Sequence, residues 1–426
     1  MTRYRELAPP PRTIMTPGPV EADPRVLRAM SYPMLGQFDP AFTALMNETM
    51  EMLRALFATA NGWAYPVDGT SRSGLEAALA ALIEPGERVL VPIFGRFGHL
   101  LHEIALRYGA EVSVIEQEWG RVFDPQQVIE AIDRVRPAVV ALVHGETSTG
   151  QLQPLREIGA ACRSRGVLLV VDAVATIGGV PVETDAWQLD AVVGGTQKCL
   201  SVPPGMAPLT YNDAAERKLL ARRRIERGLR TPEGGEAQAA RQIADAQAGM
   251  LPRERHIRSN YLDLSQLQDY WSPARLNHHT EMTSMLYGLR EGVRLALEEG
   301  LAARHARHLL HGGALAAGLE AMGLQLYGER VSRLPVVACV RIPDGIDGEA
   351  VRALLLEQFG IEIASSFGPL KGMIWRIGTM GYSCSRRNVL LTLGALEAAL
   401  LRHGLRLPAG EAVQTALQYY TRSEGI

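Results

Sequence analysis

The sequence predicts an α/β protein built on a large, mostly parallel sheet with helices on both faces. Short runs rich in β-branched residues alternate with stretches whose apolar residues recur at helical spacing. The runs are apolar without the alternation expected of half-exposed strands, so each strand should be buried on both faces. Helices that join such strands are typical of a parallel sheet. The expected strands are 88–93, 111–117, 138–145, 166–174 and 189–197.

A second, smaller α/β unit is expected after a long helical pattern that ends near residue 299. Its strands are predicted at 336–343 and 361–367. Residues 213–258 change in character, and their arginines are interleaved with glutamates, which favours a surface insertion over a polyanion site. The expected division is an N-terminal arm (1–21), a large domain (22–298), a small C-terminal domain (299–406) and a C-terminal tail (407–426).

Composition excludes several classes of protein. The 426 residues have a formal net charge of −2, which gives no electrostatic footprint for nucleic acid. No apolar run is long enough for a membrane span, and the first residues lack a secretory signal pattern. The four cysteines lie far apart, with no CxxC pair and no neighbouring histidine at metal spacing. We therefore expect a cytoplasmic protein with no metal site and no nucleic-acid or membrane partner.

One lysine has an unusual setting. Lys198 follows an apolar strand and precedes a Pro-Pro-Gly turn, in a chain with only three lysines. Partial desolvation would lower the pKa of its amine and make the nucleophilic neutral form available near neutral pH. The alternative is a lysine whose amine merely reaches solvent from a strand end. Lys218 and Lys371 are interpreted as surface charges.

Asp172 ends the apolar run GVLLVVD, at the strand end where open parallel sheets bind ligands. A buried carboxylate needs a cationic or hydrogen-bonding partner, although a turn cap would also explain an aspartate here. Lys198 follows Asp172 by 26 positions, which allows one crossover, so both should lie at the mouths of neighbouring strands. Together they could hold the ring nitrogen and the aldehyde of one pyridoxal phosphate.

Three further features point to a ligand. The segment GTSRSGLEAALAAL (69–82) predicts a hydroxyl-rich turn that opens a helix, where a phosphate fits, although most such turns are helix caps. Phe94 follows a strand and could stack on a planar ring or belong to the core. Arg376 lies in an apolar strand, where either a substrate carboxylate or an internal acidic residue could pair with it.

Together these features resemble the pyridoxal-phosphate enzymes of fold type I, and more narrowly the class V aminotransferases of the alanine:glyoxylate kind. The resemblance runs from MTPGPVEADPRVL to about residue 400. It rests on HGETSTGQLQPL, VDAVATIGG, GGTQKCLSVPPG, NHHTEM and WRIGTMG, which occur in the family's order.

The resemblance implies a role for each site residue. Lys198 would carry the cofactor, Asp172 would pair with its pyridine nitrogen, and Arg376 would bind the substrate carboxylate. Phe94 would stack on the ring and Thr147 would reach the ring oxygen. Phosphate contacts would come from Thr70, Ser71, Arg72, Gln197 and, across the interface of a homodimer, Thr280.

Two departures from the family pattern narrow the substrate. Gln37 stands where the family shows His, and Asn277 stands where a Tyr usually precedes His-His-Thr. Amides offer both donors and an acceptor, which suits a ureido group. The subgroup with such residues transfers an amino group from (S)-ureidoglycine to glyoxylate, giving oxalurate and glycine in purine catabolism. Alternatively, both amides only bond backbone at a subunit interface; His278 and His279 are interpreted as structural.

Three other functions stay open. An alanine or serine:glyoxylate aminotransferase would use the same machinery with another donor. A desulfurase-type lyase would need a mobile nucleophilic cysteine, but Cys199 and Cys339 read as buried, inert residues. A catalytically silent domain would keep the lysine without turnover.

Overall fold

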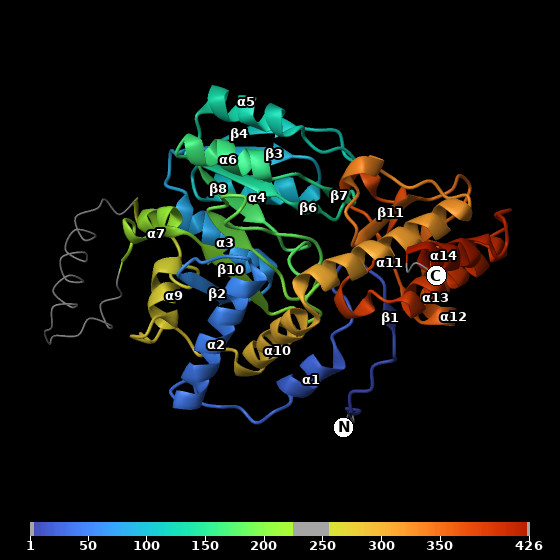
Figure 1. Cartoon of the computed structure of the whole chain (residues 1–426), viewed down its shortest axis with the longest axis horizontal. Helices are drawn as coiled ribbons and strands as arrows, with labels where there is room; N and C mark the ends of the chain where they lie inside the picture. Colours follow the sequence, from blue (N-terminus) through green and yellow to red (C-terminus); the bar gives the residue numbers. More distant parts are fainter. Residues whose placement is uncertain (1–3, 225–254, 424–426) are drawn as a thin grey trace, which may run out of the picture.

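The computed structural model describes residues 4–224 and 255–423. Within them, the largest sheet has seven strands in the order β2-β10-β9-β8-β5-β3-β4 (Figure 1). All neighbours pair in parallel except β10, which runs antiparallel to both β2 and β9. The strands are β2 (Trp63–Asp68), β3 (Arg88–Ile93), β4 (Glu111–Glu116), β5 (Val139–Val143), β8 (Leu168–Asp172), β9 (Ala191–Val193) and β10 (Met206–Tyr211).

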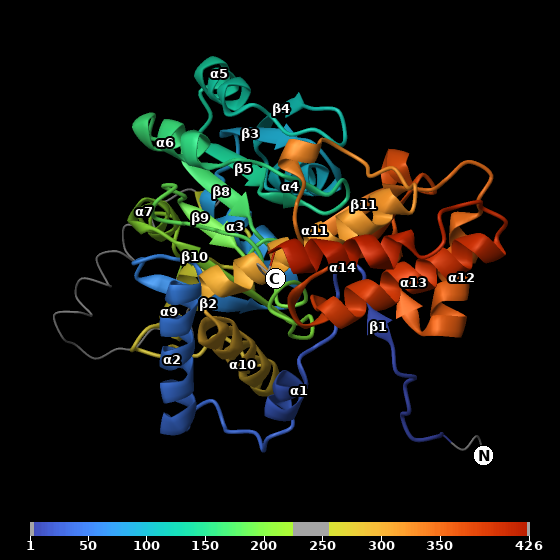
Figure 2. The same ribbon diagram turned by 45° about the vertical axis from the view of Figure 1, so that its right-hand side comes forward.

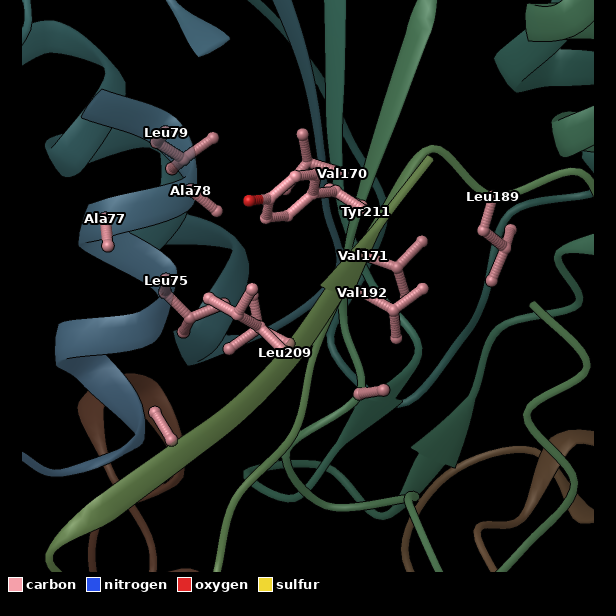
Figure 3. Close-up of a cluster of buried hydrophobic side chains, with 14 of the residues drawn as sticks. Leu75, Ala77, Ala78, Leu79, Val170, Val171, Leu189, Val192, Leu209 and Tyr211 are labelled. Carbon is pink, nitrogen blue, oxygen red and sulfur yellow. The ribbon is translucent and has the colours of Figure 1, made fainter. Parts of the chain in front are cut away.

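Helices cover both faces of this sheet. α3 (Ser71–Leu82) and α4 (Arg96–Arg107) pack on one face, and α5 (Pro125–Val135) and α6 (Arg156–Ser164) pack on the other (Figure 2). In Figure 3, Leu75 of α3 points toward Leu209 of β10 in the buried cluster between helix and sheet. This packing fixes the N-terminus of α3 at one edge of the sheet. The other α-helices in the described residues of this unit are α1 (Pro24–Met30), α2 (Pro40–Leu56), α7 (Asp213–Leu220), α9 (Leu264–Trp271) and α10 (Thr283–Glu299).

Three helices begin with the same Asp-Pro pair. Asp23, Asp39 and Asp124 each cap a helix whose first residue is proline. The aspartate side chain accepts a hydrogen bond from the next free backbone N–H, at 2.8–2.9 Å. Proline fits the first helical position because its missing N–H would have no partner there. The Asp-Pro pairs therefore set the starts of α1, α2 and α5.

The C-terminal part forms a second hydrophobic cluster around a sheet of order β11-β14-β13. Its strands are β11 (Val337–Arg341), β13 (Ala364–Ser365) and β14 (Ile374–Gly378), and its helices are α11 (Leu301–Ala321), α12 (Gly348–Phe359), α13 (Arg386–Arg402) and α14 (Glu411–Ser423). We propose Gly300, between α10 and α11, as the boundary between the domains. α14 occupies most of the predicted tail, and it packs along α11, where His311 Nδ1 lies 2.8 Å from Tyr420 Oη.

The N-terminal arm also joins this second unit. β1 (Thr13–Ile14) pairs in parallel with β12 (Ile361–Glu362), and the Gly378 N–H donates to the Met15 carbonyl at 2.7 Å. A Cβ at Gly378 would lie 2.1 Å from the Thr16 carbonyl oxygen, so only glycine permits this approach. The arm is thereby fixed along β14, on the way to Lys198.

The predicted fold class is confirmed, and all five predicted strands of the large sheet are present within a few residues. Two strands were missed: β2 (WAYPVD) and β10 (MAPLTY) each contain a proline, which normally argues against a strand. The run predicted at 361–367 forms two very short strands, β12 and β13. Of the predicted insertion, 225–254 lies outside the described residues. No helix in the described residues is both long and apolar enough to cross a membrane.

Candidate active site

Asp172 and Lys198 meet at the carboxyl edge of the large sheet. Asp172 is the last residue of β8, and it aligns with Val193, the last residue of the neighbouring parallel strand β9. Lys198 follows in the loop after β9, so the single crossover places both side chains at the same edge. Only 8% of Lys198 and 6% of Asp172 is exposed.

Burial shifts both groups toward their neutral forms. It lowers the pKa of the Lys198 amine to about 8, and the Arg376 guanidinium adds to this effect. Burial raises the pKa of Asp172 to about 7, against the opposing effects of the Val174 N–H and Lys198. The carboxylate of Glu146 adds to the rise. Near neutral pH the lysine is therefore a ready nucleophile and proton acceptor, and the aspartic acid readily ionises beside a cation.

The N-terminal arm covers Lys198, a contact that sequence reasoning missed. The Lys198 amine donates a hydrogen bond to the Pro17 carbonyl. Gly18 has φ +106°, and a Cβ there would lie 2.4–2.6 Å from the outer atoms of the Lys198 side chain. Only glycine fits this position, so the Pro-Gly-Pro segment at 17–19 is the signal that would have revealed the contact.

The turn before α3 leaves several donors available. Thr70 occupies the N-cap position, but its side chain makes no capping hydrogen bond, unlike the aspartates that cap α1, α2 and α5. Thr70 and Arg72 are exposed, whereas Ser71 is buried and donates to Gln197 Oε1 at 2.9 Å. The hydrogen bond joins this turn to the Lys198 loop. The uncapped Thr70 hydroxyl and the Arg72 guanidinium, together with the helix N-terminus, suit an anion such as phosphate.

Arg376 is buried without an acidic partner. It lies in β14 with 6% of its surface exposed, and among the described residues no carboxylate oxygen lies within 4.0 Å of it. Backbone carbonyls orient the guanidinium instead: Nε donates to Ser365 at 2.7 Å and Nη1 to Thr147 at 3.2 Å. The guanidinium carbon of Arg376 lies 4.5 Å from the centre of the Phe367 ring. A held, buried cation without a counter-ion favours an anionic ligand.

Phe94 directly follows β3 at the carboxyl edge of the sheet, and its stacking on a cofactor ring stays a prediction. Its side chain is 0% exposed and packs against Phe123 with the two rings nearly perpendicular. Phe97, in the first turn of α4, is half-buried and packs against the same hydrophobic cluster. The Phe97 N–H donates to the buried Glu146 carboxylate at 2.8 Å. Glu146 therefore links that turn to buried Thr147, a role that the sequence did not reveal.

Gln37 and Asn277 contact each other at the surface. Gln37 Nε2 donates to Asn277 Oδ1 at 3.0 Å, and Gln37 Oε1 accepts from the Glu281 N–H at 3.2 Å. These bonds join the loop between α1 and α2 to the segment before α10. Thr280 is exposed on that segment. Within the described residues these hydrogen bonds do not reach Lys198 or Arg376.

Comparison with known proteins decides the family. The model of the class V aminotransferases matches residues 28–228. The chain is 62% identical to an (S)-ureidoglycine–glyoxylate transaminase of Bacillus subtilis, over 99% of this chain and 98% of the relative. This chain belongs to the class V aminotransferases.

Solved structures agree with the sequence comparison. A ureidoglycine-glyoxylate aminotransferase from Bacillus subtilis superposes with a TM-score of 0.89 at 61% identity, covering 98% of this chain and all of that one. An alanine–glyoxylate aminotransferase from Nostoc sp. gives 0.84 at 39% identity, covering 94% and 98%. The chain is therefore an aminotransferase with the type I fold of pyridoxal-phosphate enzymes.

The family implies pyridoxal phosphate as cofactor, and the residues present fit it. A buried amine with a lowered pKa suits the aldehyde, and a buried aspartate on the next strand suits the pyridine nitrogen. The α3 N-terminus, with the uncapped Thr70 hydroxyl, suits the phosphate. Each chemical part of the cofactor thus has a matching group at one edge of the sheet.

Proposed function

We propose that this class V aminotransferase takes the amino group of (S)-ureidoglycine, releasing oxalurate, and gives it to glyoxylate, releasing glycine. The observation that carries the proposal is the Gln37–Asn277 amide pair, held by a 3.0 Å hydrogen bond. The guanidinium of Arg376, which has no carboxylate within 4.0 Å among the described residues, supports it, because both substrates carry a carboxylate. The likeness to the Bacillus subtilis transaminase supports the same donor and acceptor.

The chain's own residues would divide the work as follows. When bound, pyridoxal phosphate supplies an electron sink that stores the amino group between the two half-reactions. Lys198 would hold the cofactor and then move the substrate α-proton, since its lowered pKa suits a general base near neutral pH. Asp172 would keep the pyridine nitrogen protonated. Arg376 would bind the two carboxylates in turn, so that donor and acceptor occupy the same place.

The cofactor would be held by two chains. Thr70, Ser71, Arg72 and Gln197 would contact its phosphate within one chain, with Phe94 against the ring and Thr147 near the ring oxygen. Thr280 is exposed, and the family resemblance suggests that it would contact the cofactor of a second copy. We therefore propose a homodimer with two shared sites, in which Gln37 and Asn277 complete the partner's substrate pocket.

Two competing activities differ in what they require. An alanine or serine:glyoxylate aminotransferase would have no use for the amide pair. A lyase that attacks with cysteine would need a thiolate, but burial raises the pKa of Cys199 to about 11 and of Cys339 to about 12. All four cysteines are buried and unpaired, which supports a reducing, cytoplasmic location.

The donor test compares ureidoglycine, alanine and serine with glyoxylate as acceptor. Ureidoglycine is unstable, so it is generated in the assay from allantoate by allantoate amidohydrolase. We expect glycine formation that depends on ureidoglycine, and loss of the visible cofactor absorption when ureidoglycine alone is added. Equal or faster turnover with alanine or serine would keep the family and overturn the proposed donor.

A further inference from the structure

A second cluster of ionisable side chains lies outside the proposed active site. Asp68 ends β2, and His279 and Glu281 belong to the segment before α10. Asp68 is 4% exposed and Glu281 is 5% exposed. His279 Nε2 lies 3.0 Å from Asp68 Oδ2 and 3.7 Å from Glu281 Oε2. Three potential ligand atoms thus converge from two elements far apart in the sequence.

The converging atoms are buried, and none of them makes a well-aligned hydrogen bond in the described part of the chain, although His279 Nε2 lies 3.0 Å from Asp68 Oδ2. They are Asp68 Oδ2, both carboxylate oxygens of Glu281, His279 Nε2 and the hydroxyl of the adjacent Tyr270. Buried polar atoms in folded proteins nearly always have partners, and buried carboxylates are costly without one. The cluster therefore lacks a group that would bind these atoms.

The histidine hydrogen bonds show what kind of component is missing. The Asn260 carbonyl can only accept, so His278 Nε2, 3.2 Å away, is the donor in that bond. In a neutral His278, Nδ1 then accepts from His279 Nδ1 at 2.7 Å. A neutral His279 consequently presents the lone pair of Nε2 to the two carboxylates. Acceptor atoms that face one another favour a cation between them.

We propose that Asp68, His279 and Glu281 bind a divalent transition-metal ion. One imidazole and two carboxylates suit Zn²⁺ or Mn²⁺ better than Mg²⁺, which prefers oxygen ligands. Ligands about 2.1 Å from an ion are separated from one another by about 3.0–3.4 Å. The separations of 3.0 and 3.7 Å from His279 Nε2 need only a small adjustment. Tyr270 or water would complete the coordination.

The alternative is a proton in place of the ion, either on His279 Nε2, which would then donate to Asp68 Oδ2 at 3.0 Å, or shared between the carboxyl groups. Burial and the Asp68 carboxylate raise the pKa of Glu281 well above its usual value, as expected of two buried acids without a cation. A bound ion would replace that proton and keep both carboxylates ionised. The two arrangements differ in whether metal binds at all, which makes them separable by experiment.

The position of the cluster gives the ion a positioning role. Asp68 directly precedes the turn of Thr70, Ser71 and Arg72, and Glu281 directly follows Thr280. The Glu281 N–H also donates to Gln37. An ion here would fix the predicted phosphate turn and the Gln37–Asn277 segment relative to each other. This inference concerns metal binding and does not depend on the identity of the amino donor.

The test titrates Mn²⁺ into the chelator-treated holoenzyme and follows free Mn²⁺ by electron paramagnetic resonance. We expect one tight site per chain, competed by Zn²⁺ and not by Mg²⁺. Asp68→Asn and Glu281→Gln should weaken Mn²⁺ binding at least about tenfold. Asp133→Asn, which removes an exposed carboxylate paired with Arg165, should leave binding unchanged. No site in the wild type, or equal binding by Glu281→Gln, would overturn the proposal.

A second measurement needs no variant that might misfold. Crystals of the wild type grown with Mn²⁺ should show an anomalous scattering peak between Asp68, His279 and Glu281. A partner's side chain in that position, or carboxyl oxygens in direct hydrogen-bonding contact with no peak, would refute metal binding in favour of the other arrangement.

Discussion

The two ends of the proposed substrate site are built in contrasting ways. Arg376 lies inside a strand, is buried, and is oriented by two backbone carbonyls. Gln37 and Asn277 lie in surface segments and hold each other through side chains. The end that would bind the carboxylate of either substrate is therefore rigid, whereas the end that would distinguish substrates rests on replaceable surface residues. Such a division allows the amino donor to change without disturbing the chemistry.

We expect the largest effect from replacing Lys198, the buried amine of the proposed active site. Lys198→Ala should lower steady-state turnover with ureidoglycine and glyoxylate by at least about 10³-fold, because the variant loses both the cofactor attachment and the proton carrier. Lys218→Ala, which removes an amine paired with Glu87, is the matched control and should retain activity. Normal turnover by Lys198→Ala would refute the proposed site.

Replacing Arg376, at the rigid end of the site, should have the next largest effect on activity. That effect should be similar for both substrates. Arg376→Gln should lower kcat/KM for ureidoglycine and for glyoxylate alike, by about 10²-fold, because a charge-assisted hydrogen-bond pair is lost. Arg376→Lys should recover only part of the loss, since an ammonium cannot form two parallel bonds to a carboxylate. Separate half-reaction kinetics measure each substrate. A defect confined to one of them would show that the carboxylates bind at different places.

Replacing Gln37 and Asn277 should change the preference for the amino donor without loss of the cofactor. Gln37→His combined with Asn277→Tyr should lower kcat/KM for ureidoglycine by at least about tenfold relative to alanine, because the ureido donors and acceptors lose their partners. Cofactor absorbance should persist. The control is Gln266→Ala, an amide change elsewhere on the large domain. An unchanged donor preference would mean that the amides serve only the subunit contact.

The smallest effect is a pH dependence of stability in the cofactor-free protein. Asp172 has a pKa raised from 3.8 to about 7, so its contribution to stability is fully present below pH 3.8 and is lost as the pH rises through 7. Asp172→Asn removes this ionisable carboxyl group. The variant should therefore gain stability relative to wild type across that range, measured by denaturant unfolding at several pH values. A pH-independent difference would show that Asp172 is not desolvated as described.

The sequence predicted what depends on local pattern and missed what depends on long-range approach. Apolar runs located the strands, and their order located Asp172 and Lys198 at one edge. The hydrogen bond from Lys198 to the Pro17 carbonyl was missed because it joins residues 181 positions apart in the sequence. No metal site was expected, since Asp68 lies more than 200 residues from His279 and only the fold brings them together.

The Gly18–Lys198 contact has a mechanical consequence. The arm that carries Gly18 is hydrogen-bonded to β12 and β14 of the small domain, while Lys198 belongs to the large one. Any rotation of the small domain would therefore move the N-terminal arm relative to the Lys198 amine and change how far water reaches that amine. A chain trimmed before residue 19 would leave the amine hydrated, raise its pKa toward that of an ordinary surface lysine, and uncouple it from domain motion.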